Sequence, residues 1–311
     1  MSPPLTGLHH VTVICGPAQR HLDFYAGHLG LRLVKQTVNF DDPGTYHLYF
    51  ADGEARPGSV WTSFPWANGR RGRAGAGQAT ATAYAVSPGA VEAWQNALAE
   101  TGEDIGNRFE RFGETGLRLV DPDGLVIELI ETEGADGQWA EGSVPIDRAL
   151  GTFHSVTLCS RAPESTALLL TEAYGYRQLD QEGDRLRLVN DAAPHARYVD
   201  LFCEPAAEIG QMGTGTVHHV AFRAPTDEAE LEVRERLLSM GLQPTPVIDR
   251  QYFHSVYTRE PGGILFEIAT DPPGFAVDEP ADQLGQTLKL PPQYETQRTA
   301  IEARLEPLRL P

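Results

Sequence analysis

One order of secondary structure repeats four times along the chain of 311 residues, and this repeat limits the folds that it can adopt. Each repeat predicts a strand, a helix and three further strands, over about 60–70 residues. The first strands are expected at 7–14, 79–86, 152–157 and 217–222, and the helices at 17–26, 89–100, 163–173 and 227–240. A unit of this size shares its core with its neighbours. We therefore predict an α+β chain of four βαβββ modules.

Changes in composition divide the chain into halves and a tail. Residues 133–150 are polar and contain several glycines, which is typical of a linker. We predict an N-terminal domain at 1–135, with modules one and two, and a C-terminal domain at 150–271, with modules three and four. From Pro272 the sequence is proline-rich and then predicts a short amphipathic helix near 295–305. The segment 272–311 is therefore expected to be a tail that wraps over the surface.

Charge and cysteine usage exclude several classes of function. The formal charge of −18 argues against nucleic acid and anionic membranes as partners, since both require a basic face. No run of about 18 apolar residues predicts a membrane span, and the N-terminus does not resemble a secretory signal. The cysteines are three in number and lack CxxC spacing. We predict buried free thiols and a reducing cytoplasm rather than a disulfide or a thiolate zinc site.

A pair of histidines opens the first strand of modules one and four. The pairs are His9-His10 and His218-His219, and each precedes a valine. Because side chains alternate between the faces of a strand, only one histidine of each pair points into a shared cavity. The second of each pair occupies an equivalent position. A lone histidine on a strand is usually a core residue, but two at equivalent positions favour a shared site built from His10 and His219.

Glu267 lies in the otherwise apolar last strand of module four, within the sequence Pro261–Ala269. Burial of an unpaired carboxylate is costly, so a partner cation is expected beside it. Together with His10 and His219, Glu267 forms a set of two histidines and one carboxylate. Such a set leaves coordination positions open and suits non-haem Fe(II) that activates oxygen. Mn(II) suits the same ligands.

The middle modules carry a second set of polar residues. Glu128 stands at the place of Glu267, His154 is taken as the equivalent of His219, and Asp200 lies in the last strand of module three. The first strand of module two has no histidine. We interpret this set as a structural polar cluster or a decayed site, with a second metal site as the alternative.

The repeated unit, the His-His-Val openings and the final strand with the pattern Pro-x-Gly-x-x-x-Glu resemble the vicinal oxygen chelate superfamily. Segments 46–52 and 249–271 are similar to the hydroquinone-cleaving branch of its ring-cleaving dioxygenases, and the resemblance covers about residues 5–311. It implies a fold of two cupped, strongly curved mixed sheets built from the four modules.

The resemblance also implies a function, which is a non-haem Fe(II)-dependent ring-cleaving dioxygenase of the extradiol type. Its substrates would be O2 and a small aromatic diol, either a hydroquinone or a catechol. The family's iron ligands match His10, His219 and Glu267. Its pocket positions match two catalytic candidates, His218 and Tyr257, and two substrate-binding candidates, His9 and Thr12. One of the catalytic pair would act as the acid that helps to break the O–O bond.

Two other functions remain open at the level of sequence. A metal-dependent lyase or isomerase of the glyoxalase type would take a fourth ligand from the last strand of the partner unit, but residues 60–64 contain no carboxylate. A non-catalytic protein that binds an aromatic ligand would leave Glu267 without a partner. The chain is compatible with a homo-oligomer in either case.

Overall fold

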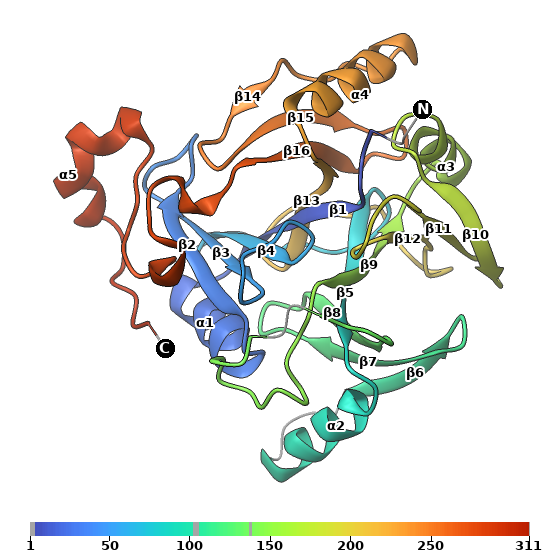
Figure 1. Cartoon of the computed structure of the whole chain (residues 1–311), viewed down its shortest axis with the longest axis horizontal. Helices are drawn as coiled ribbons and strands as arrows, with labels where there is room; N and C mark the ends of the chain where they lie inside the picture. The colour runs from blue at the N-terminus through green and yellow to red at the C-terminus, as the bar shows by residue number, and fades with distance from the viewer. Residues whose placement is uncertain (1–3, 102–105, 137–138, 311) are drawn as a thin grey trace.

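The computed structural model describes residues 4–101, 106–136 and 139–310 and contains two curved sheets of eight strands each. Figure 1 shows both sheets. The domain halves predicted from the sequence do not correspond to the sheets, because each sheet takes strands from both halves of the chain. The fold class of four modules in two curved mixed sheets is confirmed.

The first sheet combines modules one and four in the order β14-β15-β16-β13-β1-β4-β3-β2. Strand β1 pairs antiparallel with β13, while β1 with β4 and β13 with β16 are parallel, so the sheet is mixed. Its strands are β1 (Leu8–Cys15), β2 (Arg32–Val38), β3 (Tyr46–Ala51), β4 (Val60–Pro65), β13 (Thr216–Ala224), β14 (Ile248–Asp249), β15 (Phe253–Arg259) and β16 (Leu265–Pro273).

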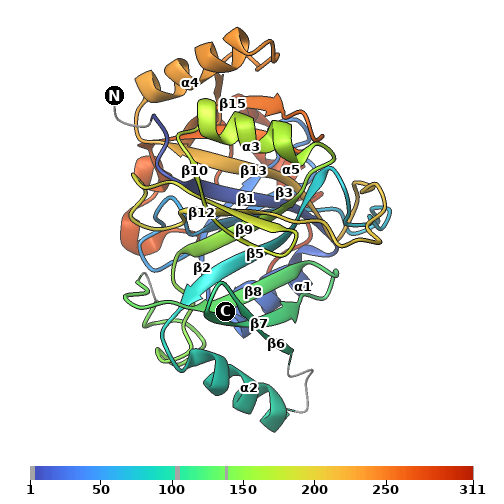
Figure 2. The same ribbon diagram turned by 90° about the vertical axis from the view of Figure 1, so that its right-hand side faces the viewer.

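The second sheet combines modules two and three in the order β10-β11-β12-β9-β5-β8-β7-β6. Its central pair, β5 and β9, is antiparallel, as β1 and β13 are in the first sheet. Figure 2 shows both central pairs running through the middle of the molecule. The strands are β5 (Gln78–Val86), β6 (Asn107–Arg111), β7 (Glu114–Val120), β8 (Val126–Glu131), β9 (Phe153–Cys159), β10 (Arg177–Glu182), β11 (Arg185–Val189) and β12 (Tyr198–Leu201).

One helix per module packs an apolar side against the sheets. Their innermost side chains, including Leu22, Trp94, Leu169 and Leu237, belong to one apolar core that reaches both sheets. In both views α2 and α4 lie at opposite ends of the molecule. The helices are α1 (Ala18–Leu22), which continues as the π-helical η1 (Asp23–His28), α2 (Ala90–Thr101), α3 (Pro163–Glu172) and α4 (Asp227–Ser239). Within the described ranges, no helix has the length and apolar character needed to span a membrane.

The C-terminal tail lies along the edge strand β2, at the left of Figure 1. The backbone N–H of Lys289 donates to the carbonyl of Gln36, and the buried Nζ of Lys35 contacts Asp278 at 2.6 Å and Glu279 at 2.5 Å. The tail therefore covers the surface as expected, but its helix is shorter than predicted. It contains the 3-10 turns η2 (Phe275–Val277), η3 (Ala281–Gln283) and η4 (Pro292–Gln297), and helix α5 (Arg298–Glu302).

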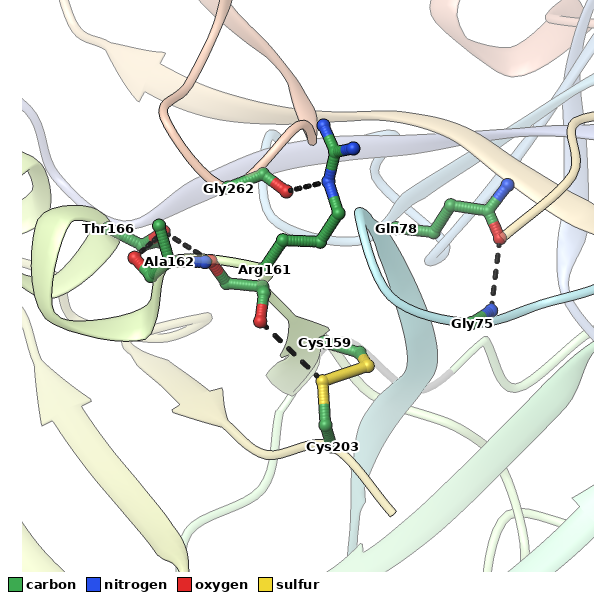
Figure 3. The surroundings of a disulfide bond; sticks show 9 residues. Gly75, Gln78, Cys159, Arg161, Ala162, Thr166, Cys203 and Gly262 are labelled. Carbon is green, nitrogen blue, oxygen red and sulfur yellow. Dashed lines mark hydrogen bonds between the residues drawn. A yellow bond between two sulfur atoms is a disulfide. The ribbon is translucent and has the colours of Figure 1, made fainter. Parts of the chain in front are cut away.

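The prediction of three free thiols is wrong for two of them. Cys159, at the end of β9, and Cys203, just after β12, form a disulfide across 44 residues of sequence (Figure 3). Strands β9 and β12 are parallel neighbours, so the fold brings their ends together. No local spacing signals such a pair, which is why the sequence did not reveal it. Cys15 is free and buried, as predicted.

Candidate metal centre

Strand register brings the predicted ligands His10, His219 and Glu267 to one place. On β13, Ala221 is the partner of His10 across the antiparallel pair and of Glu267 across the parallel pair with β16. His219 lies two residues from Ala221 and therefore on the same face of the sheet. The β1–β13 register shifts between Leu8 and His10, and such an irregularity re-aims neighbouring side chains.

The three ligand atoms are close and shielded from solvent. The Nε2 atoms of His10 and His219 are 3.2 Å apart. Oε2 of Glu267 lies 3.2 Å from Nε2 of His10 and 2.8 Å from Nε2 of His219. All three side chains are buried. Two imidazoles and one carboxylate on adjacent strands form a compact set of nitrogen and oxygen ligands.

The neighbouring histidines settle which ring nitrogens face inward. Nδ1 of His10 lies 2.9 Å from Nδ1 of His9, and Nδ1 of His219 lies 2.7 Å from Nδ1 of His218. Burial lowers the pKa of His9 well below its usual value and that of His218 to about 3, so both rings are neutral and offer an acceptor nitrogen. When the inner histidines donate their Nδ1–H groups to these acceptors, both Nε2 atoms carry free lone pairs.

The two carboxylate oxygens of Glu267 differ in their partners. Oε1 accepts a hydrogen bond from Ser255 at 2.5 Å. Oε2 is buried and receives no hydrogen bond from any described residue. Burial by itself would raise the pKa of Glu267, but His10 and His219 outweigh it and hold the pKa well below the usual range. When both Nε2 atoms are unprotonated, a carboxylate oxygen and two imidazole lone pairs converge on one place, which fits a bound cation.

A cavity of about 250 Å³ opens beside these ligands, and its walls are mainly aromatic. Such a shape suits one flat ring, because ligand pockets are concave and largely apolar with a few polar groups. The lining residues are His10, Asn39, Phe40, Asp41, His47, Tyr49, Phe64, Trp66, His218, His219, Arg250, Phe253, Tyr257 and Leu265.

Both catalytic candidates from the sequence lie in the cavity wall. The ring of Tyr257 is 5.7 Å from that of His219, and the ring of His218 packs edge-on against Phe64. Burial, followed by the charge of Glu267, raises the pKa of the Tyr257 phenol, so the phenol keeps its proton. Tyr257 is thus a hydrogen-bond donor, and neutral His218, whose Nδ1 accepts from His219, carries its ring proton on Nε2 and is a donor as well.

The two substrate-binding candidates lie behind the wall and do not line the cavity. His9 supports His10 and packs against Phe253 at 5.2 Å between ring centres. Thr12 is fully buried and its hydroxyl lies 2.9 Å from that of Thr62. Thr62 in turn contacts Nε2 of His47, which does reach the cavity. A direct contact between substrate and His9 or Thr12 stays a prediction that this geometry does not support.

The sequence reasoning missed one cation in the cavity wall. The guanidinium of Arg250 lies 5.3 Å from the ring centre of Tyr257, 5.6 Å from that of Phe40 and 3.8 Å from a carboxylate oxygen of Asp41. Asp249-Arg250 belongs to a segment that supported the family resemblance, but the sequence assigned it no role. Arg250 adds a positive charge where an oxygen anion of a bound ring can lie.

The polar set in the second sheet is not a copy of this centre. On β5, Ala83 is the partner of both Ser155 and Glu128, as Ala221 is of His10 and Glu267. This register makes Ser155, rather than His154, the equivalent of a ligand histidine, so the alignment of His154 with His219 was wrong by one residue. His154 bonds to Glu114 instead, at 3.0 Å.

Among the described residues one other set of ligand-type atoms converges, and no sequence pattern indicates it. Cys15, His21 and Asp123 are buried, with donor atoms within 4.8 Å of one another. Burial raises the pKa of the Cys15 thiol well above its usual value, so it stays protonated and is a poor ligand. Asp123 already pairs with Arg20 and accepts from the backbone of Gly16. This set is a structural cluster at the end of β1.

Four βαβββ modules that place two histidines and a glutamate on adjacent strands of a cupped sheet define a class of metal-binding folds. The chain belongs to the Glyoxalase/Bleomycin resistance protein/Dioxygenase superfamily, whose model matches residues 7–129 and 161–268. This membership confirms the resemblance inferred from the sequence.

Individual relatives cover almost the whole chain. It is 47% identical over 99% of its length to "Putative ring-cleaving dioxygenase MhqO" of Bacillus subtilis, with 98% of that protein covered. It is 36% identical to "Chlorohydroquinone/hydroquinone 1,2-dioxygenase" of Sphingobium indicum, with 93% and 92% covered. A crystal structure of a dioxygenase described as putative, from B. subtilis, superimposes with a TM-score of 0.95 at 47% identity, with 100% and 99% covered. Glyoxalase I of Zea mays shares the fold at a TM-score of 0.60 and 16% identity, with 85% and 92% covered.

Proposed function

We propose that this chain is an Fe(II)-dependent ring-cleaving dioxygenase that acts on a hydroquinone-type aromatic diol. The main support for the proposal is that the side chains of His10, His219 and Glu267 are buried and meet at the base of an aromatic cavity. Three protein ligands leave coordination positions for substrate and oxygen. The names of the relatives, which refer to ring cleavage and to hydroquinone, support the same reaction.

In this proposal His10, His219 and Glu267 hold the metal. A bound Fe(II) would supply the electrons that make O2 reactive toward an aromatic ring and would lower the pKa of a ring hydroxyl. Both oxygen atoms enter the product and one carbon–carbon bond next to a hydroxylated carbon breaks, as in extradiol cleavage, so no external reductant is consumed. Mn(II) is the alternative metal for the same ligands.

The other cavity residues bind and orient the substrate. Tyr257 donates its phenolic hydrogen to a substrate oxygen, and Arg250 beside it stabilises negative charge on that oxygen. His218, whose Nδ1 accepts from His219, is neutral and donates its Nε2–H to a substrate oxygen. Phe40, Phe64 and the other aromatic walls hold the ring and exclude water.

A glyoxalase-type reaction is the second candidate, since the fold is shared with glyoxalase I. Such a site takes a fourth protein ligand from the last strand of the partner module. On β4, the residue that corresponds to Glu267 by register is Thr62, the partner of Thr12. Its hydroxyl is neutral and already engaged by His47. A three-ligand centre with open positions favours oxygen chemistry.

The proposal is tested by anaerobic reconstitution of the full chain with Fe(II) or Mn(II), followed by exposure to O2. Chlorohydroquinone, methylhydroquinone and catechol are compared as substrates. We expect one O2 consumed per ring, a product mass increased by both oxygen atoms, and preference for the hydroquinones. No oxygen uptake with any diol would overturn the proposal.

Glu267→Gln is the matched variant for this experiment. It keeps the size of the side chain but removes the negative charge that attracts the metal. We expect loss of bound iron, measured by metal analysis, together with loss of oxygen uptake. Full iron content in the folded variant would rule out this ligand set.

A further inference from the structure

The second sheet encloses a cavity of its own, of about 340 Å³, which the reaction proposed above does not use. The strand register of the second sheet repeats the register at the candidate metal centre, but two of the three ligand residues are replaced. Ser155 and Ala81 occupy the positions that correspond to the histidines, and only the carboxylate, Glu128, is retained. A metal with the same coordination therefore lacks two of its three ligands here.

A network of arginines and carboxylates lies beside this second cavity, and Arg118 and Arg185 of that network line it. Arg111 and Arg118 each approach Glu128 at 2.8 Å. Across the sheet, Arg187 contacts Asp200 at 2.8 Å and also pairs with Glu114, whose other oxygen contacts His154. Arg185 shares Asp200 at 3.3 Å.

The charges of this network do not cancel. Four guanidinium groups face three carboxylates, so one positive charge is in excess. Glu204 also lines the cavity, but it is exposed to solvent, which screens its charge. The side chain of Arg118 is 37% exposed, so the excess positive charge lies in the part of the cavity wall that solvent reaches, where a bound anion can pair with it.

Arg185 is the group that is least satisfied. Its Nη1 donates to Thr157 at 3.0 Å and to Asp200, and its guanidinium lies 4.2 Å from the ring centre of Phe202. Its Nε and Nη2 make no hydrogen bond to residues 4–101, 106–136 and 139–310, and they are not among the buried polar atoms that lack a partner, so solvent in the cavity reaches them. Burial, followed by the charge of Arg111, lowers the pKa of Arg185, which agrees with a shortage of negative charge around it.

We propose that the second cavity binds a small organic carboxylate with a flat apolar group. The carboxylate would accept hydrogen bonds from the free nitrogens of Arg185 and from Arg118, which also lines the cavity. A single negative charge matches the single excess positive charge. Phe202, Val126 and Ala81 form an apolar wall that suits a hydrocarbon body and that inorganic phosphate cannot use.

The disulfide helps to keep this cavity formed. Cys159 lies in the wall, and Cys203 begins the segment whose Ala206 and Ala207 also line the cavity. Figure 3 shows the bond tying β9 to that segment, with Gly75 of the neighbouring loop nearby. The cross-link holds the walls at a set distance, which favours a preformed site.

Crystals of the full chain soaked with 4-bromobenzoate test the proposal directly, because bromine gives an anomalous signal. We expect a bromine peak near Phe202, with the carboxylate against Arg185. A peak confined to the cavity beside His10 and Arg250, or no peak, would overturn the proposal. This result does not depend on the proposed dioxygenase activity.

Calorimetric titration in solution separates the contributions of charge and shape. We expect benzoate to bind and neutral benzamide to bind at least about tenfold more weakly, because benzamide loses the charge-assisted hydrogen bonds. Inorganic phosphate keeps its charge but has no apolar body to contact Phe202 and Val126, and it should also bind more weakly than benzoate. Equal binding of benzoate and benzamide would exclude the proposed charge pairing.

Two variants and one control complete the test. Arg185→Gln is expected to weaken benzoate binding about tenfold or more, with oxygen uptake on hydroquinone unchanged. Ala206→Trp, at an exposed position, fills the cavity without changing charge and should weaken binding even if the arginine variant does not fold. Arg108→Gln, on exposed β6, should bind as the wild type does. Unchanged binding in Ala206→Trp would count against the site.

Discussion

At the scale of single residues, the metal centre depends on how polar atoms are shared between neighbours. Each ligand histidine uses Nδ1 toward its preceding histidine and keeps Nε2 for the centre. Glu267 is fixed in the same way, because Ser255 holds one oxygen and leaves the other free. Partners of this kind orient the ligands and raise their affinity for a metal.

Ser255→Ala is expected to lower metal affinity by about 10–100-fold while leaving the fold intact, because Glu267 loses the hydrogen bond that orients it. Metal affinity is measured by competition with a chelator. Thr258→Val on the same strand is the control, since its buried hydroxyl has no partner among the described residues and can be removed without effect on the metal. Equal affinities in the two variants would show that Ser255 does not position the carboxylate.

At the scale of elements, the strands are joined by ion pairs as well as by backbone hydrogen bonds. Glu114 of β7 bonds to His154 of β9 and to Arg187 of β11, so it links three strands that are not all adjacent. Lys35 plays a comparable part between β2 and the tail. Both links are mostly buried, so each contributes more than an exposed surface pair does.

Glu114→Gln is expected to destabilise the protein at pH 7 by at most about 3 kcal/mol. Burial opposes ionisation of Glu114, but His154 and Arg187 lower its pKa from 4.5 to about 2. Since the folded-state pKa lies below the unfolded one, the stabilisation is complete above about pH 4.5 and is lost as the pH falls toward 2. Urea unfolding at several pH values measures the difference from wild type.

The exposed carboxylate of Glu110 on neighbouring β6 provides the control for this prediction. Glu110→Gln should change the free energy of unfolding by less than about 0.5 kcal/mol at any pH. A difference between Glu114→Gln and wild type that did not vary with pH would contradict the assigned pKa shift.

Lys35→Met is expected to cost about 3–5 kcal/mol, because it leaves Glu279 buried without its cation. The double variant Lys35→Met/Glu279→Gln removes that unpaired charge and should recover part of the loss. Denaturant midpoints report the stability, and limited proteolysis reports whether the tail has detached. If the double variant were no more stable than the single one, the buried charge would not be the cause.

At the scale of the whole molecule, the two sheets share one strand register, but their two cavities differ in chemistry. The sheet of modules one and four holds the proposed metal ligands, and that of modules two and three holds arginines and carboxylates. The Cys159–Cys203 disulfide lies only in the second sheet. It removes the cysteine-based argument for a reducing cytoplasm, so a cytoplasmic location stays a prediction without that support.

The disulfide predicts that protein denatured without reductant exposes one reactive thiol, Cys15, which mass spectrometry after alkylation can count. Cys159→Ser/Cys203→Ser is expected to lower the free energy of unfolding by about 2–4 kcal/mol, since it releases a loop closed over 44 residues. Cys15→Ala is the control without a cross-link and should retain the bond. Three reactive thiols in the unreduced wild type would contradict the assignment.

The sequence alone predicted the order of strands and helices and three candidate site residues, His10, His219 and Glu267, which the fold brings together. These follow from local patterns, because strand alternation, turn residues and an acid in an apolar strand each depend on near neighbours in the chain. His154 shows the limit of such reasoning, since a one-residue error in register moves a side chain to the other face.

Only the tertiary structure decided which modules share a sheet, and therefore what surrounds the doubled histidines. Ser255 and Arg250 gained their roles from the pairing of β15 with β16 and from loops that meet over the cavity. The disulfide, and the ion pairs of the arginines beside the second cavity, likewise join residues from different elements. Such contacts depend on packing across the whole chain, and no local pattern carries that information.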